Sequence, residues 1–225
     1  MVRTKRVKRA AKRKTRRMKG GNIPTFHVLI VTAGRKGLLR MLDSLKPQLR
    51  ENDAITIVFD GKHAKKKSTY NDDSVKDMKC KVTVIEQVPG LKAYGHASMN
   101  KYLPDLKPET TYAMFADDDD YYIDGAFDAL RKSCMDPDIL YVAKMRNNGG
   151  LIPPEGTREI GGGKIGKPCG IIPFKDKAKS KLGEAGYAGD LEYYHDLKTK
   201  VKGVAFLEDI IYEVESQGNV NGNVE

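Results

Sequence analysis

Short apolar runs, separated by polar turns that contain glycine, divide the chain into alternating strand and helix patterns. The first run, 26–31 (FHVLIV), is rich in β-branched residues, and leucines at helical spacing follow it after a short polar turn. This pattern predicts a strand, a loop and a helix. The same reasoning predicts further strands at 54–59, 81–85, 112–116, 139–143, 171–174 and 204–212, and helices at 95–103, 125–134 and 190–200.

Strands that alternate with helices predict an α/β fold with a mostly parallel central sheet and flanking helices. A chain of 225 residues with 40% hydrophobic content is long enough to bury one sizeable core, and we expect a single domain. In open sheets of this kind, ligands bind beyond the carboxyl ends of the strands, where loops converge and helix N-termini point at anions. The residues that follow each predicted strand are therefore the first candidates for a site.

Four consecutive aspartates, Asp117 to Asp120, follow the predicted strand 112–116 directly. Unit charges about 4 Å apart near a protein surface repel by roughly 4 kcal/mol, so a positive charge is expected beside them. Carboxylates without neighbouring Cys or His favour a hard cation such as Mg²⁺ or Mn²⁺, which often completes its shell with substrate phosphates. The alternative is an acidic turn that caps the following helix.

The basic charge of the chain is concentrated at its N-terminus. Lys and Arg number 40 against 30 Asp and Glu, which gives a net charge of +10, but residues 1–19 contain eleven of the basic residues and no acid. The remainder has 29 basic and 30 acidic residues and is close to neutral. We expect residues 1–21 to be a disordered basic tail, with contact to an anionic surface or a localisation signal as alternatives. The polar segment 216–225 is expected to be a frayed tail or linker.

The composition also bears on where the protein is located in the cell and on the role of its cysteines. The apolar run nearest to the basic tail is too short for a signal peptide or a transmembrane segment, so the sequence predicts a soluble, cytoplasmic protein. The three cysteines, Cys80, Cys134 and Cys169, are odd in number and lack CxxC spacing. They indicate neither a disulfide framework nor a zinc site.

Three segments resemble the GT-A-fold glycosyltransferases, and within them the inverting, family-2-like group. They are VLIVTAGRKGLLRMLDSL (28–45), ITIVFDGK (55–62) and YAMFADDDDYYIDGA (112–126), which spans a strand, an acidic DxD motif and the aromatic residues after it. The resemblance implies a Rossmann-like GT-A domain over 22–215, with a nucleotide-binding half at 22–135 and an acceptor half at 136–215. It implies hexosyl transfer from a nucleoside-diphosphate sugar, with a UDP-sugar as the first candidate, to a hydroxyl of a glycan or glycoprotein acceptor, assisted by Mn²⁺ or Mg²⁺.

The same resemblance assigns individual residues. Asp117 and Asp119 would be the metal ligands, and Asp60 would contact the nucleobase or ribose. His96 and Asn100 are four residues apart, so on a helix they share one face, which the family places near the donor; a plain polar surface is the alternative reading. The residues expected to bind the donor are Thr32, Ala33, Gly34, Arg35, Asp60, Gly61, His96, Asn100, Asp117, Asp118 and Asp119.

A later segment, GEAGYAGDLEYYHDLK (183–198), resembles the acidic motif that supplies the catalytic base in this family. Asp190 is the expected base, because an inverting transfer needs a carboxylate to take the proton of the attacking hydroxyl. The alternative is that Asp190 caps its helix, and Glu192 is then the next candidate. His195 is interpreted as a solvent-exposed residue of the same helix and is left out of the metal site.

A Gly/Pro-rich stretch, 147–170, is expected to form a mobile loop. Within it, 161–167 (GGGKIGK) matches the GxxxxGK pattern of a P-loop, but Pro168 stands where that motif needs a hydroxyl. The stretch fits better as a lid that closes over the donor, with Lys164 and Lys167 within reach of a diphosphate.

Two other functions remain possible from the residues alone. A nucleotidyltransferase that acts on sugar phosphates also uses aspartates at strand ends, but it would show a longer glycine-rich loop than TAGRKG (32–37). A nucleic-acid-binding protein acting through the basic tail would leave the aspartates unexplained. The segments FDGKH (59–63) and GHASMNK (95–101), with the lysine-rich tail, resemble glycosyltransferases of large algal viruses. That resemblance implies a virion glycoprotein as acceptor and the host cytoplasm as location.

Overall fold

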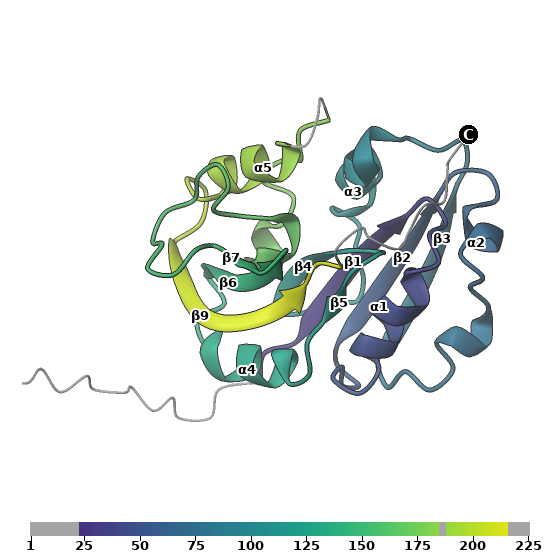
Figure 1. Ribbon diagram of the computed structural model, residues 1–225, viewed down its shortest axis with the longest axis horizontal. Coiled ribbons are helices and arrows are strands. Elements are labelled where there is room, and N and C mark those ends of the chain that lie inside the picture. The colour runs from purple at the N-terminus through teal and green to yellow at the C-terminus, as the bar shows by residue number, and fades with distance from the viewer. Residues whose placement is uncertain (1–22, 185–187, 216–225) are drawn as a thin grey trace, which may run out of the picture.

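The computed structural model describes residues 23–184 and 188–215, which form one mixed α/β domain built on a curled sheet (Figure 1). In this part of the chain the sheet has nine strands in the order β3-β2-β1-β4-β8-β6-β9-β5, and β7 pairs with β6 at its side. The predicted tails, 1–21 and 216–225, lie outside the described residues. No helix within 23–184 and 188–215 is long and apolar enough to cross a membrane.

The first half of the sheet is parallel. It consists of β1 (Phe26–Thr32), β2 (Ala54–Asp60), β3 (Lys81–Gln87) and β4 (Tyr112–Asp117). β1 lies in the middle, and its Val31 pairs with Asp117 of β4. All seven residues of β1 are buried, as its continuous apolar run predicts for a strand covered on both faces. The carboxyl ends of these strands therefore meet at one edge.

The second half is mixed and curls away from the first. β8 (Gly170–Pro173) runs antiparallel to both β4 and β6 (Ile139–Asn147), while β9 (Gly203–Glu213) runs parallel to β6. The far edge is β5 (Tyr121–Tyr122), and β7 (Gly150–Ile152) folds back on β6 as a hairpin. The long curved strand that crosses Figure 1 is β9, and it returns the chain to the aspartates after β4.

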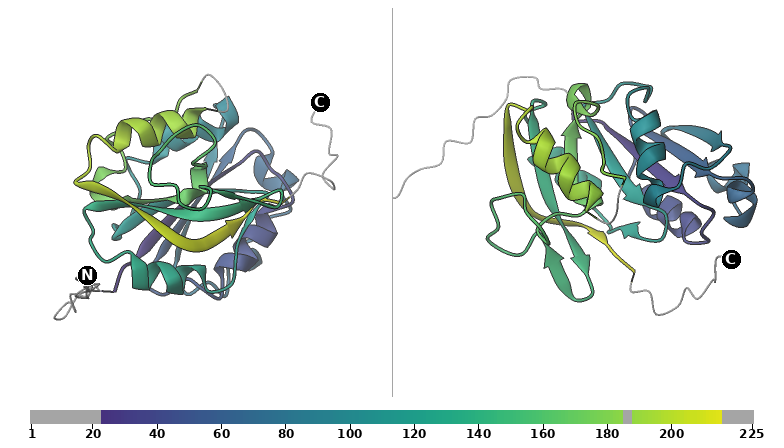
Figure 2. Two further views of the ribbon diagram at one scale, coloured as in Figure 1. Left: turned by 60° about the vertical axis from the view of Figure 1, so that its left-hand side comes forward. Right: turned by 90° about the horizontal axis from the view of Figure 1, so that it is seen from above.

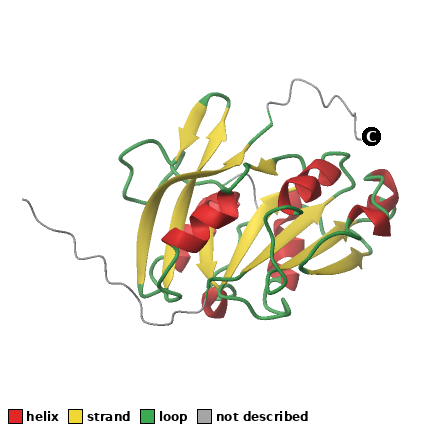
Figure 3. Cartoon of the chain, turned by 90° about the horizontal axis from the view of Figure 1, so that it is seen from below, coloured by secondary structure: helices red, strands yellow, loops and turns green. Residues whose placement is uncertain are grey.

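Helices cover both faces of this sheet (Figures 1 and 2). On one face, α4 (Ala126–Ser133) lies beside α1 (Leu38–Leu45), and its Phe127 packs edge-on against Phe26. On the other face lie α3 (His96–Tyr102) and α5 (Gly189–Leu197), where Tyr193 packs edge-on against Phe115 of β4. The short α2 (Ala64–Lys67) follows β2. Figure 3 shows the parallel strands at one side and the mixed strands at the other.

The predicted elements are confirmed within a few residues at their ends. Each predicted strand and helix is present, and the fold is the predicted single α/β domain. The structure adds α2, β5 and β7, which the apolar pattern did not predict. The expected loop 147–170 is more ordered than its composition indicates, because β6 extends to Asn147 and pairs with β7 across a turn at Asn148 and Gly149.

Candidate active site

The four aspartates form a turn at the carboxyl end of β4, next to the loop that follows β1. The backbone of this turn is tied to β9: the N–H of Asp117 donates a hydrogen bond to the hydroxyl of Tyr212, over 3.0 Å. The N–H of Glu215 donates to Oδ1 of Asp120, over 3.1 Å. β9 and the residues that follow it thus fix both ends of the acidic turn.

Two cations from other parts of the chain neutralise the exposed aspartates. Arg35, from the loop after β1, donates from Nη1 to Asp119 Oδ2 at 2.6 Å and to Asp118 Oδ1 at 3.3 Å. Lys167, from the Gly/Pro-rich stretch, forms an ion pair with Asp117. The sequence predicts a positive charge beside the aspartates, and in the structure these two side chains supply it. Asp117 and Asp119 keep side-chain exposures of 33% and 29%, so a ligand can reach them.

The other two aspartates are buried. Burial raises the pKa of Asp118 to about 6, although the nearby hydroxyl of Thr32 and the charge of Arg35 oppose this. Oδ2 of Asp118 has no hydrogen-bond partner in the described part of the chain. Burial, together with the charges of Asp117 and Asp119, raises the pKa of Asp120 to about 7. The turn therefore holds more negative charge than its surroundings favour, and an added cation would relieve that imbalance.

The loop after β1 packs directly on this turn. The N–H of Gly34 donates to Oγ1 of Thr32 at 2.9 Å, which folds the loop back on the end of β1. A Cβ on Gly37 would lie 2.8 Å from both Asp118 O and Asp119 Cα. Only glycine fits here without a shift of the neighbouring backbone, because the backbone of the loop packs directly against the backbone of the acidic turn. Thr32 is buried, whereas Ala33 and Arg35 are exposed beside the turn.

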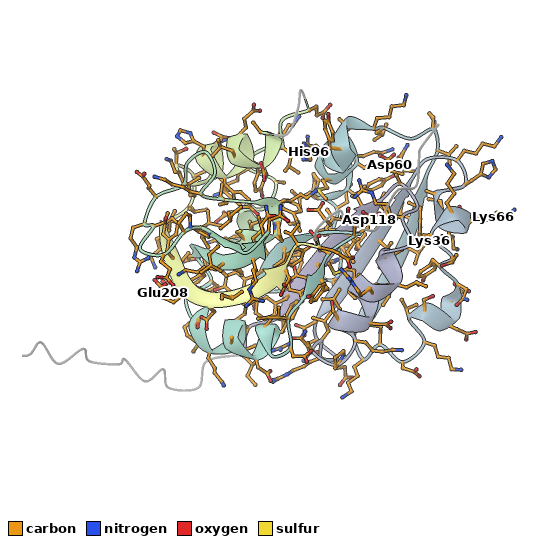
Figure 4. All side chains as sticks on the ribbon, in the orientation of Figure 1. Lys36, Asp60, Lys66, His96, Asp118 and Glu208 are labelled. Atoms are coloured by element: carbon orange, nitrogen blue, oxygen red, sulfur yellow. The ribbon has the colours of Figure 1, made fainter. Side chains whose placement is uncertain are left out.

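Asp60, at the end of β2, supports a neighbouring loop. Its Oδ1 accepts a hydrogen bond from the N–H of Leu91 at 2.6 Å, and its Oδ2 accepts one from the N–H of Lys92 at 3.2 Å. Lys92 is the first of four consecutive residues with positive φ, and Gly95 is the last. Asp60 lies on the same edge as the acidic turn (Figure 4), and its carboxylate holds the loop before α3. Gly61 follows β2 directly.

His96 and Asn100 share one face of α3, as their spacing predicts. Both side chains contact the segment 182–184 that leads towards α5. The side chains of His96 and Asn100 therefore have hydrogen-bond partners within the protein.

Asp190 is the second residue of α5 and lies within electrostatic range of the same cation as the acidic turn. Burial raises the pKa of its carboxyl, and the hydrogen bond from the N–H of Leu191 and the charge of Lys167 oppose that rise. Ala188 occupies the capping position of α5, while Asp190 Oδ1 accepts from the N–H of Leu191 at 2.8 Å. Asp190 is thus inside the first turn of the helix, and Glu192 and His195 of the same helix are exposed.

The Gly/Pro-rich stretch contributes one of its two lysines to the site. The backbone carbonyl of Lys167 accepts a hydrogen bond from the hydroxyl of Tyr194 of α5 at 2.6 Å, and the Lys167 side chain is only 11% exposed. Lys164 instead forms an ion pair with Glu159 within the stretch. Lys167 is therefore held between the acidic turn and α5.

The donor set fits a hard divalent cation. Asp117 and Asp119 offer accessible carboxylate oxygens without sulfur or imidazole beside them, and Oδ2 of Asp118 lacks a partner. Among the described residues, no three His, Cys, Asp or Glu side chains form a ready metal cage. Two carboxylates completed by phosphate oxygens are typical of Mg²⁺ sites in nucleotide-dependent enzymes.

The sequence pattern did not identify three residues that shape the site. In the sequence, Tyr212 is only one apolar residue of a predicted strand, but in the structure its hydroxyl accepts a hydrogen bond from the N–H of Asp117 in the acidic turn. Arg40, on α1, lies 4.6 Å over the ring of Tyr121 and forms an ion pair with Glu215. These partners are up to 175 residues apart in the chain, and no local pattern links them.

Two hollows lie away from this edge. One, of about 880 Å³, is lined by residues at the end of α1 and the start of α4, including Arg50, Asp124 and Asp128. The other, of about 640 Å³, is lined by Tyr112, Met135 and Lys177 among others. Neither hollow includes an aspartate of the acidic turn.

Comparison with known proteins identifies relatives by fold only. No protein-family model matches the chain, and no curated protein matches its sequence. Among solved structures, the mannosyltransferase PcManGT from Pyrobaculum calidifontis, in complex with GDP-Man and Mn²⁺, is similar at 12% identity with a TM-score of 0.61. That similarity covers 88% of this chain and 59% of the other.

A second similar structure is S. aureus TarS 1–349, at 17% identity with a TM-score of 0.58. This similarity covers 84% of the present chain and 60% of the other. The chain thus spans about three fifths of the length of both structures. It shares the fold of a mannosyltransferase, and this agrees with the resemblance found in its sequence.

Proposed function

We propose that this chain is a metal-dependent glycosyltransferase that moves a sugar from a nucleoside-diphosphate donor to a hydroxyl of a glycan or glycoprotein, with inversion at the anomeric carbon. The observation that carries the proposal is the accessible aspartate pair at the carboxyl end of β4, with Arg35 and Lys167 beside it and Asp190 in range of Lys167. The shared fold with a structure that holds GDP-Man and Mn²⁺ supports it.

Each residue has a defined role in this proposal. The loop Thr32–Arg35 and Asp60 with Gly61 would line the nucleotide, and Asp117 and Asp119 would hold Mn²⁺ or Mg²⁺. The bound ion would neutralise the diphosphate as its bond to the sugar breaks. Arg35 and Lys167 would turn from the aspartates to the phosphate oxygens when the donor binds, because these cations then exchange one anionic partner for another.

Asp190 would act as the general base. It takes the proton of the acceptor hydroxyl while the hydroxyl oxygen forms its bond to the anomeric carbon, and the electron pair of the breaking bond leaves with the nucleoside diphosphate. A carboxyl whose pKa is raised by burial is better matched to this task than a fully solvated one, because it holds a proton more firmly at neutral pH. UDP is the first candidate for the nucleotide.

The aspartates also separate this proposal from its rivals. In a nucleotidyltransferase, an anionic phosphate oxygen of the sugar phosphate would attack the α-phosphate of a nucleoside triphosphate and pyrophosphate would leave, so no base is needed at Asp190. A protein that acts only through its basic tail needs neither Asp190 nor the acidic turn. A partly buried carboxyl at Asp190, within electrostatic range of Lys167, favours transfer of the sugar.

Replacement of the base tests the proposal. The assay is release of nucleotide from UDP-glucose, GDP-mannose and dTDP-glucose with water as acceptor and Mn²⁺ present. We expect Asp190→Asn to lower kcat by about 10² to 10⁴ because the amide cannot take a proton, while nucleotide affinity is retained. Asp196→Asn, on the same helix and exposed, is the matched control and should keep its activity.

The released sugar reports the stereochemistry. An α-linked donor should give the β-anomer in proton NMR before mutarotation. Full activity of Asp190→Asn, or release of intact nucleoside monophosphate and sugar phosphate, would contradict the proposal.

A further inference from the structure

The contact between α3 and the segment before α5 is built from partly buried, directional hydrogen bonds. His96 is 5% exposed, and its Nδ1 lies 2.6 Å from the carbonyl oxygen of Gly183. A carbonyl oxygen can only accept, so Nδ1 carries the hydrogen and donates it. The imidazole of His96 is therefore held in one tautomer and one orientation by the backbone that it contacts.

Asn100, one helical turn further along α3, binds the same segment through both the nitrogen and the oxygen of its side-chain amide. Its Nδ2 donates to the carbonyl oxygen of Leu182 at 2.8 Å, and its Oδ1 accepts from the N–H of Leu182 at 2.8 Å. Nδ2 also lies 3.1 Å from Oε1 of Glu184. A reciprocal pair of bonds to one residue fixes the position and the direction of the backbone there.

The segment held in this way is joined directly to the start of α5. The N–H of Gly183 donates to the carbonyl oxygen of Gly189, the first residue of that helix, over 3.1 Å. A Cβ on Gly189 would lie 2.1 Å from Gly183 O and 2.5 Å from His96 Nδ1. The start of α5 therefore packs against the histidine as well as against the segment, and Asp190 is the next residue.

We propose that His96 and Asn100 are positioning residues that hold Asp190 against the site by clasping the segment 182–184 and the first residue of α5. This inference rests on the proposed role of Asp190 as the base. Figure 4 shows His96 between α3 and α5, on the same side of the molecule as Asp118. Nδ1 of His96 and both amide atoms of Asn100 bond to this segment, so these hydrogen bonds are accounted for without contact to the donor.

The test compares variants that break the clasp with variants that keep it. His96→Leu removes the donor to Gly183, and Asn100→Asp removes the donor to Leu182 while it keeps nearly the same shape. His96→Asn is the conservative partner, because its amide nitrogen can occupy the position of Nδ1. His195→Leu makes the matched change at the exposed histidine of α5. Two clasp-breaking sites keep the test valid if one variant fails to fold.

Three measurements are made on the full chain. The first gives kcat and donor KM for nucleotide release from UDP-glucose, or from GDP-mannose if GDP is the nucleotide bound. The others are nucleotide affinity by calorimetry and amide hydrogen exchange of peptides from α3 and α5. A base displaced by about 1 Å can cost on the order of 10²-fold in rate. We expect kcat to fall about 10- to 100-fold in His96→Leu and Asn100→Asp, with donor KM and nucleotide affinity within about twofold of the original values.

Hydrogen exchange at the start of α5 should rise in the same two variants, and His96→Asn and His195→Leu should remain close to the unaltered protein in all three measurements. A parallel loss of nucleotide affinity would overturn the proposal and place His96 and Asn100 at the donor. Faster exchange without loss of kcat would also overturn it and leave a purely structural contact. Absence of nucleotide binding by the unaltered protein is a separate result, and it would remove the proposed function on which the clasp depends.

Discussion

Single residues in this protein are constrained most where a charge is buried. Asp53 is 1% exposed and accepts hydrogen bonds from the N–H groups of Phe26 and Arg50, both at 2.8 Å, while its carboxylate pairs with the buried guanidinium of Arg131. That guanidinium also lies 5.5 Å over the ring of Phe26. The pair links the start of β1 to α4, far from the acidic turn.

Removal of one member of this pair should be costly. We expect Arg131→Ala to lower the free energy of unfolding by about 3 to 5 kcal/mol, because it leaves Asp53 buried and without its counter-charge. Arg50→Ala is the control, since Arg50 pairs with Asp128 at the surface, where both side chains are more than half exposed. That change should cost less than about 1 kcal/mol. Urea denaturation measures both, and similar losses in the two variants would contradict the account.

His27 gives stability a dependence on pH. Burial lowers its pKa from 6.5 to about 4, and its ring is hydrogen-bonded to Thr56 at 2.8 Å and to the carbonyl of Pro108 at 3.1 Å. The unfolded chain therefore binds this proton more readily than the folded one. Stability contributed by neutral His27 is complete above pH 6.5 and is lost as the pH falls towards 4, by up to about 3 kcal/mol.

The measurement is the free energy of unfolding at several pH values between 7 and 4. His27→Gln should flatten the fall relative to the unaltered protein, because the titrating group is gone. His195→Gln, at an exposed position, should leave the slope as it was. An unchanged slope in His27→Gln would show that other groups cause the acid sensitivity.

At the scale of elements, the loop between β1 and α1 sets the shape of the acidic turn. Gly37 has a φ of −59°, which any residue can adopt, so its requirement is for space alone. We expect Gly37→Ala to push the backbone of Asp118 and Asp119 outward and to weaken metal-dependent nucleotide binding by about tenfold or more, which corresponds to about 1.4 kcal/mol. Overpacking should also cost about 1 to 3 kcal/mol of stability.

Gly150→Ala is the control for that change. Gly150 begins β7, and its nearest neighbour to an added Cβ would be Asn147 O at 3.5 Å, an ordinary contact. Nucleotide titration in the presence of Mn²⁺ compares the two variants. Equal affinity in Gly37→Ala and the unaltered protein would show that the turn does not depend on this approach.

The strands and the longer helices could be predicted because their patterns are local. The run FHVLIV predicts a buried strand, and the leucines after it predict α1. The two residues of β5 and the four of α2 are too short to carry a period. β7 was not predicted because its composition resembles that of a loop. It is a strand because it pairs with β6.

The positions of the candidate site residues in the fold were predictable to a similar extent. Strand ends identified Thr32–Arg35, Asp60 and the aspartates as neighbours, since the carboxyl ends of parallel strands meet. The i, i+4 spacing placed His96 and Asn100 on one face, but their partners lie 82 to 87 residues further along the chain. Which segment they contact is a property of the tertiary structure, and the same holds for Tyr212 and Lys167.

At the scale of the whole molecule, the curled sheet assembles one edge from distant parts of the chain. Aspartates from the end of β4, Arg35 from the loop after β1 and Lys167 from the Gly/Pro-rich stretch meet there, and Asp190 of α5 lies within electrostatic range of Lys167. Outside residues 1–19 the chain is close to neutral, so the negative charge of this edge is local and would be balanced by a local cation. We propose that this cation is a metal ion and that it helps to bind a nucleotide.

Calorimetric titration of UDP, GDP and dTDP, with and without Mn²⁺, tests that claim most directly. The account predicts that one nucleotide binds only with metal, and that Asp119→Asn weakens its binding by more than about tenfold, while Asp124→Asn, at an exposed position just beyond the turn, binds as before. Failure of all three nucleotides to bind under either metal condition, or unchanged affinity in Asp119→Asn, would contradict it.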